Sequence, residues 1–263
     1  MSQTAPTPIL ELNQVLSELV SGIKNILGND VLAVYLQGSF AVGDWDAGSD
    51  VDFLVVLEHE IPEDLLPELQ AMHSRIYALP STWAQHLEGS YISQKVLRES
   101  DTSIPLWYLN NGSQQLIQDT HCNTLVVRWT TREYGIPLFG VESKALIEPV
   151  SEAGLRLEVE KVMRDWTKEV LAQPDQLKNR WVQHYTVLSY CRMLQTLQTA
   201  RIESKRSAAI WGSEHLEPYW KNLIAKAWEE HVKQRQNVKL LAEPEDAEQT
   251  LAFVQYVLDF RIF

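Results

Sequence analysis

Two aspartates separated by one residue, Asp50 and Asp52, are the residues of this 263-residue chain best placed to do chemistry. They lead into an apolar run, VDFLVVL, and in an extended strand residues at this spacing project to the same face. Two carboxylates held side by side repel each other, and burying them is costly unless a cation neutralises them. Mg²⁺ binds one or two carboxylates and completes its shell with water and substrate phosphates. The pair therefore predicts a Mg²⁺ site that orients a nucleoside triphosphate for phosphoryl or nucleotidyl transfer.

An upstream pair, Gly38 and Ser39, fits the same chemistry because it directly follows a predicted strand. A glycine lets backbone N–H groups approach a phosphate, and a serine can donate a hydrogen bond to it. A structural alternative exists, in which Asp50 caps a turn and Asp52 lies at an exposed strand edge. The combined pattern G-S-x10-D-x-D, with an apolar strand on each side, favours the binding site.

A third carboxylate is expected from a neighbouring strand, either as a further metal ligand or as the general base for an acceptor hydroxyl. Glu88, in the sequence WAQHLEGSYI, is the best candidate. The alternation there places Glu88 on one face with His86 and Ser90. The alternative is that Glu88 is a solvated surface residue.

The first half of the chain contains both helix-like and strand-like patterns of apolar residues. Apolar residues recur at helical spacing in some segments and in short β-branched runs in others, with glycine and proline between them. The predicted elements are a helix over 9–27 capped by Gly28, strands over 31–36 and 51–57, a helix from 65 to near 80, a third strand within 82–96, a loop over 110–112 and a packed helix over 124–133.

The second half is almost wholly helical. Pro149 and Ser151 mark the expected domain boundary, and the spacing beyond them predicts helices over 155–171, 181–197, 216–232 and 247–263. We therefore expect an α/β domain over 1–150 followed by an all-α helical bundle over 151–263.

Charge and cysteine content narrow the choice of partner. Lys and Arg total 23 against 35 Asp and Glu, a formal net charge of −12, which disfavours nucleic acid because phosphate binding depends on basic side chains. Two cysteines, Cys122 and Cys191, are too few for a disulfide framework or a thiolate zinc site. Because no apolar run reaches ~20 residues and no basic leader is present, we expect a cytoplasmic protein that binds no membrane. We also expect a monomer.

Other polar residues have open roles. The segment Asp119–Asn123, which leads into Arg128 and Trp129, could line an acceptor pocket, or it could cap a helix and contribute core residues. His121 and His184 are candidate polar contacts, whereas surface positions are expected for His59, His73, His215 and His231.

These features resemble a known superfamily, since G-S-x10-D-x-D is the hallmark of nucleotidyltransferases, which include the polymerase β-like fold. Most of the chain resembles, more specifically, the aminoglycoside adenylyltransferases that modify streptomycin and spectinomycin. The further matching segments are the Glu88 strand, LVVRWTTREYGIPLFG at 125–140, VLSYCR at 187–192, Lys205, Trp211 and a closing FVQYVLDF.

The resemblance implies a two-domain enzyme that uses ATP and Mg²⁺ to transfer AMP to a hydroxyl of a small molecule, such as an aminoglycoside or aminocyclitol antibiotic. In that family, bases at the positions of Arg192 and Lys205 reach from the helical domain to the nucleotide phosphates. The implied site residues are Asp50 and Asp52 for metal binding and catalysis, Glu88 for catalysis, and Gly38, Ser39, Arg192 and Lys205 for binding ATP.

One segment departs from the resembled family. Just before VLSYCR those enzymes carry acidic residues that hold the cationic drug, whereas this chain has Trp181-Val182-Gln183-His184-Tyr185, and the nearest upstream acid is Asp175. The identity of the acceptor therefore stays open. A second class of function also stays open, namely a non-catalytic nucleotide-binding or antitoxin-like interaction protein on the same fold.

Overall fold

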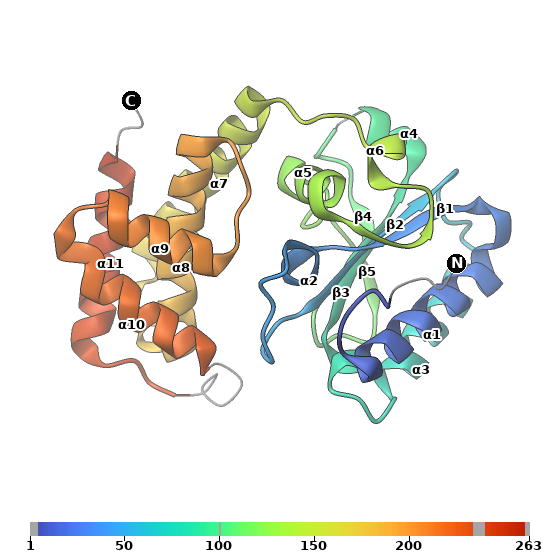
Figure 1. Cartoon of the computed structure of the whole chain (residues 1–263), viewed down its shortest axis with the longest axis horizontal. Helices are drawn as coiled ribbons and strands as arrows, with labels where there is room; N and C mark the ends of the chain where they lie inside the picture. The colour runs from blue at the N-terminus through green and yellow to red at the C-terminus, as the bar shows by residue number, and fades with distance from the viewer. Residues whose placement is uncertain (1–4, 100, 234–239, 261–263) are drawn as a thin grey trace. The chain divides into compact units, whose positions relative to one another are not determined.

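The computed structural model describes residues 5–99, 101–233 and 240–260. The chain divides into two compact units. The first, here called the sheet unit, takes the residues up to 45 and those from 49 to 150; the second, the helical unit, takes 46–48 and those from 151 onward (Figure 1). No helix within the described ranges is both long enough and apolar enough to cross a membrane.

The sheet unit is built on a mixed sheet with the strand order β5-β4-β3-β2-β1-β6. β2 and β3 run parallel, and the other neighbouring pairs are antiparallel. The strands are β1 (Val31–Leu36), β2 (Val51–Leu57), β3 (Leu87–Ser93), β4 (Leu106–Leu109), β5 (Leu116–Asp119) and β6 (Ile136–Gly140).

The alternation along β2 divides the apolar residues between two cores. Phe53 and Val55 face one core, which α1 and α3 complete. Leu54 and Val56 face the other, which includes residues of α4 and α6. The helices of this unit are α1 (Leu10–Leu27), α2 (Gly38–Val42), α3 (Leu66–Tyr77), α4 (Gln94–Glu99), α5 (Leu125–Tyr134) and α6 (Ser143–Leu146).

Segments that are distant in sequence lie close together at one end of the central strands. β2 and β3 are parallel, so both begin at this end, where Asp52 and Glu88 lie. β1 and β4 run the opposite way and end there, so Gly38 follows β1 and Asn111 follows β4 at the same end. The topology therefore positions the residues that the sequence singled out.

The helical unit is centred on α8, which packs against the other helices of the unit. Asn179 caps α8 by accepting a hydrogen bond from the backbone N–H of Val182 at 3.1 Å, which satisfies one of the orphan donors of the first turn. The helices are α7 (Glu152–Ala172), α8 (Arg180–Thr199), α9 (Lys205–His215), α10 (Lys221–Val232) and α11 (Pro244–Asp259).

The predicted fold class, an α/β unit followed by helices, is confirmed, and the strands predicted over 31–36 and 51–57 have those bounds. The third strand is shorter than predicted, because 83–86 form a 3-10 turn and α4 begins at Gln94. β4, β5 and β6 were not predicted, since strands of four or five residues are too short to show a period. Helix α9 was not predicted either. The last predicted helix ends at Asp259, and residues 261–263 lie outside the described residues.

Two histidines expected at the surface are instead buried. His73 on α3 is 2% exposed, with its Nε2 2.7 Å from the hydroxyl of Tyr91, and His231 on α10 is 8% exposed. The expectation for His73 and His231 was wrong because a lone histidine on an amphipathic helix does not show which neighbours cover it. Burial lowers the pKa of His73 to about 3.

This buried histidine should make folding sensitive to acid. The folded state keeps His73 neutral, while the unfolded chain takes up a proton near pH 6.5, so the contribution is complete above pH 6.5 and is lost as the pH falls towards 3. At pH 5 the loss is about 2 kcal/mol. In urea unfolding at pH 7 and pH 5, His73→Phe should therefore show a smaller pH dependence than the wild type by about that amount. Equal pH dependence in the two proteins would contradict the assignment.

Candidate active site

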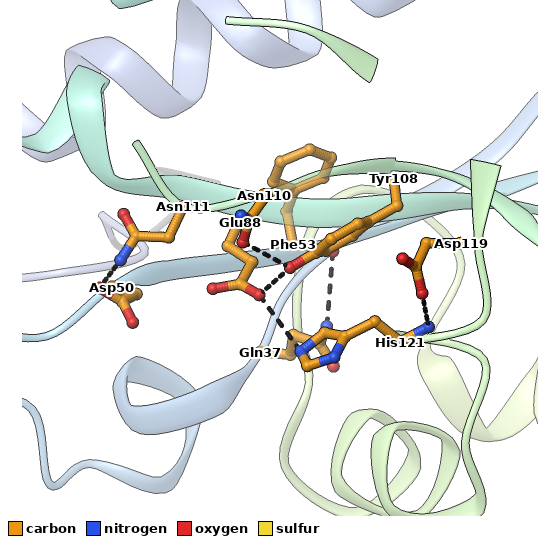
Figure 2. Close-up of polar contacts among 9 residues, drawn as sticks. All are labelled: Gln37, Asp50, Phe53, Glu88, Tyr108, Asn110, Asn111, Asp119 and His121. Atoms are coloured by element: carbon orange, nitrogen blue, oxygen red, sulfur yellow. Dashed lines mark hydrogen bonds and ion pairs between the residues drawn. The ribbon is translucent and has the colours of Figure 1, made fainter. Parts of the chain in front are cut away.

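Asp52 and Glu88 are registered neighbours across the parallel pair β2 and β3. Registered partners in a parallel pair point to the same face, so their carboxylates share one face at one end of the central strands. Asp50 immediately precedes β2, and its charge acts on Glu88. The three acids named from the sequence therefore belong to one region of the sheet unit, and Figure 2 shows two of them, Asp50 and Glu88.

The turn after β1 lies against Asp52. The backbone N–H of Gln37 donates to the Asp52 carbonyl at 2.9 Å, and Gly38 has a φ of 64°. A Cβ on Gly38 would overlap the Asp52 carboxylate, so this approach requires glycine. Ser39 Oγ is buried and finds no hydrogen-bond partner among the described residues. A phosphate oxygen bound at this turn would satisfy that hydroxyl.

Gly38→Ala should displace the Asp52 carboxylate and weaken the binding of ATP in the presence of Mg²⁺, measured by calorimetry. Gly43 offers a matched control, because it also has a positive φ, 78°, but its Cβ would enter open space. Both variants carry the same kind of backbone strain, and only the first collides with the candidate site. Equal ATP affinity in the two variants would show that the close approach has no role in binding.

Asp50 is oriented by the turn after β4. Asn111 Nδ2 donates a hydrogen bond to Asp50 Oδ1 at 2.6 Å, and Asn111 Oδ1 lies 3.0 Å from Nδ1 of His86 (Figure 2 shows the first contact). The sequence predicted a loop here, and it carried no signal that an asparagine of that loop contacts an acid more than sixty residues away. Asn111 is therefore a site residue that only the structure reveals.

Glu88 is largely enclosed, with its side chain 16% exposed. The Tyr108 hydroxyl donates a hydrogen bond to Glu88 Oε1, and His121 Nε2 lies 3.6 Å from the same oxygen. Burial raises the pKa of Glu88 and the charge of Asp50 adds to the rise, while the Tyr108 hydrogen bond and His121 oppose it. A carboxylate whose pKa is displaced towards neutrality suits a general base.

The segment Asp119–Asn123 lies between the acids and the core of the sheet unit. His121 and Cys122 border the acids, and burial together with the charges of Glu88 and Asp52 raises the pKa of the Cys122 thiol. The end of the segment is structural, because Arg128 is 3% exposed and donates to Asn123 Oδ1 at 2.8 Å. Each of the two interpretations left open from the sequence therefore has support in part of this segment.

The helical unit brings the two predicted phosphate-binding bases near one another. Arg192 lies on α8 and Lys205 begins α9, and both charges act on the buried His231. Burial, and then these charges, lower the pKa of His231 to about 3, and burial with Lys205 lowers that of His184 to about 4. Both histidines are therefore neutral at pH 7, and Asp46 Oδ2 lies 3.8 Å from His231 Nε2, so Arg192 and Lys205 are the cationic groups of this cluster.

Gln183 lies in the segment where the resembled adenylyltransferases carry a drug-binding acid, and in this protein it is part of the packed interior. Gln183 is 4% exposed, and its Nε2 donates to Thr250 Oγ1 at 2.8 Å. The rings of Trp181 and Tyr185 stack nearby, with centroids 4.9 Å apart and planes 13° apart. Lys205 Nζ lies 5.4 Å from the Tyr185 ring centroid. This part of the helical unit therefore offers half-buried aromatic rings where the resembled enzymes carry a carboxylate.

The donor set in the sheet unit fits Mg²⁺ with a phosphate ligand. Asp50 and Asp52 provide hard carboxylate oxygens, and Mg²⁺ commonly takes one or two of these with phosphate oxygens and water. Across the described ranges, no group of three or more His, Cys, Asp or Glu side chains could hold a metal ion. Two carboxylates leave the other positions around such an ion to phosphate oxygens and water.

Two family models match the chain. Residues 16–102 match the nucleotidyltransferase domain, and residues 145–259 match the C-terminal domain of aminoglycoside adenylyltransferase. The first match includes Gly38, both aspartates and Glu88, and the second includes Arg192 and Lys205.

Relatives and solved structures agree with these matches. A spectinomycin 9-adenylyltransferase from Staphylococcus aureus is 25% identical over 201 residues, which cover 72% of this chain and 73% of the relative. An aminoglycoside (3'') (9) adenylyltransferase from Escherichia coli is 25% identical over 264 residues, covering 95% of this chain and 94% of the relative. A crystal structure of spectinomycin adenyltransferase from Enterococcus faecialis, with ATP and spectinomycin, shares the fold with a TM-score of 0.68 and 17% identity over 94% of this chain and 99% of that chain. The chain is thus an aminoglycoside adenylyltransferase-like protein, in which a nucleotidyltransferase domain precedes the C-terminal domain of that family.

Proposed function

We propose that this protein transfers AMP from ATP to a hydroxyl group of an aminoglycoside or aminocyclitol antibiotic. The observation that carries the proposal is the pairing of Asp52 with Glu88 across β2 and β3, with the Gly38 backbone against Asp52. This arrangement supplies acids for a metal, a candidate base and a phosphate-binding turn on one sheet. The named activities of the relatives supply the class of acceptor.

In the proposed reaction Asp50 and Asp52 hold Mg²⁺, which neutralises charge on the triphosphate when it is bound. Glu88 takes the proton from the acceptor hydroxyl. The acceptor oxygen forms a bond to the α-phosphorus of ATP, the bond from that phosphorus to its bridging oxygen breaks, and pyrophosphate leaves. The product is an O-adenylylated small molecule.

We assign the binding of the phosphates to Ser39, Arg192 and Lys205. Ser39 has a buried hydroxyl in need of an acceptor, and Arg192 and Lys205 are two cations that both act on His231 in a chain of net charge −12. Because phosphate groups interact best with charged donors, local cations are needed to offset the acidic surroundings.

The acceptor is expected to differ from a polycation. Gln183 is buried and hydrogen-bonded where the resembled enzymes carry a drug-binding acid, and the segment from Trp181 to Tyr185 contains no carboxylate. Since a bound cation without a counter-charge is costly, we expect slower adenylylation of streptomycin-like polycations than of less charged aminocyclitols.

The test is a panel of aminoglycosides and aminocyclitols incubated with the protein and Mg-ATP. Pyrophosphate release together with a product heavier by one AMP supports the proposal, and chelation of Mg²⁺ should abolish both signals. A uniformly negative panel, with AMP transfer to other hydroxyl compounds, would overturn the acceptor class alone. Tight Mg-ATP binding without pyrophosphate release from any acceptor would favour the non-catalytic alternative.

A further inference from the structure

Glu88 is held by one of its two carboxylate oxygens. The Tyr108 hydroxyl donates to Oε1, and His121 Nε2 lies 3.6 Å from the same atom. Neither contact involves Oε2, which accepts no hydrogen bond from the residues that the structure describes. The two carboxylate oxygens therefore have different surroundings (Figure 2).

The two groups that contact Oε1 are themselves held in place. Tyr108 lies on β4 and is 4% exposed, so packing fixes its ring. The His121 ring lies 5.3 Å from the Tyr108 ring, and the His121 backbone N–H donates to Asp119 Oδ1 at 2.8 Å. Both contacts to Glu88 are thus anchored to β4 and to the segment that follows β5.

We propose that Tyr108 and His121 are positioning residues for the base: they fix Oε1 of Glu88, so that Oε2 is the oxygen that takes the proton from the acceptor hydroxyl. This inference rests on the proposed function, in which Glu88 is the base. A base acts only within hydrogen-bond reach of the proton it removes, and a carboxylate free to rotate spends less time in that geometry.

This arrangement has a specific chemical advantage. The Tyr108 hydroxyl donates a hydrogen bond to Oε1, and the His121 ring lies within ion-pair distance of the same oxygen, so Oε2 is left to accept a proton. Charge-assisted hydrogen bonds to a carboxylate are also stronger than neutral ones, so the orientation persists while the group is ionised. The contacts therefore orient the reactive form of Glu88.

Tyr108→Phe and His121→Ala should each lower kcat about tenfold or more, with the KM for ATP and for the acceptor changed less than about twofold. His121→Gln, which retains an N–H donor, should recover part of the loss. Tyr35→Phe is a matched control, because the Tyr35 hydroxyl donates to the Val141 carbonyl at 2.8 Å in the same unit and away from Glu88. His59→Ala is the control for a histidine paired with an acid elsewhere, since His59 Nδ1 lies 2.6 Å from Asp30 Oδ1.

A double-mutant cycle separates positioning from a general structural effect. With Glu88→Gln as the background, Tyr108→Phe and His121→Ala should cause little further loss, because the base they position is absent. The proposal would be overturned if each substitution lowered kcat by the same factor in the Glu88→Gln background as in the wild type. It would also be overturned if both single variants had the kcat of the wild type. If Tyr108→Phe fails to fold, the exposed His121 carries the test alone, since its side chain is 65% exposed.

The failure of the proposed function gives a different pattern. A fully active Glu88→Gln variant, or a wild-type protein that transfers no AMP, would show that Glu88 does not act as the general base. Either result would overturn both proposals. An active wild type, an inactive Glu88→Gln variant and unaffected Tyr108 and His121 variants would overturn only the positioning role.

Discussion

Replacing Asp50 by asparagine is expected to lower the rate of AMP transfer by about 10³-fold or more and to weaken ATP binding that depends on Mg²⁺. The physical reason is the loss of one of two negative charges that would hold the ion, in a reaction where charge stabilisation supplies most of the catalysis. Asparagine retains the size of the side chain and an oxygen that can accept from Asn111 Nδ2, which lies 2.6 Å from Asp50 Oδ1. The variant therefore tests the charge rather than the packing.

Calorimetric titration of ATP with and without Mg²⁺, beside the rate of pyrophosphate release, measures both effects. Asp64→Asn is a suitable control, because Asp64 is an exposed acid of the same unit outside the site. This control removes one negative charge from the protein and should leave both quantities unchanged. Wild-type affinity for Mg-ATP in the Asp50 variant would contradict the metal-binding role.

Glu88→Gln is expected to lower kcat by about 10²- to 10⁴-fold while leaving the affinity for ATP close to that of the wild type. Glutamine has nearly the same shape and can still accept the hydrogen bond from Tyr108, but it cannot take a proton. The loss should therefore fall on the chemical step and not on binding.

The pH profile gives a second measurement of the same residue. A base must be ionised to act, so kcat should fall as the pH drops through the pKa of Glu88. Because burial raises that pKa above the ordinary 4.5, the acid limb should lie at a higher pH than for an exposed glutamate, and it should be absent from the residual activity of the variant. Glu68→Gln, an exposed acid on α3, serves as the control. An unchanged kcat in Glu88→Gln would show that another group is the base.

Local patterns were enough to predict the two central strands of the sheet unit. β1 and β2 follow from a β-branched run and a second apolar run, and Gly38, which has a positive φ, directly follows the first strand region. The same stretch contains Asp50 and Asp52, so fewer than twenty residues are enough to predict a Mg²⁺ site there. The alternation around Glu88 also predicted a strand there, and Glu88 lies on β3.

The tertiary structure decided which distant groups contact those residues. Strands β4 and β5 are too short to show a pattern, yet they bring Tyr108, Asn111 and His121 to the acids. The burial of His73 likewise depends on helix α3 packing against the sheet. Periodicity in a sequence reports which face of an element is apolar, whereas strand order and register arise from the burial of all elements together. For that reason the candidate acids could be predicted from the sequence, whereas the residues that contact them could be identified only from the tertiary structure.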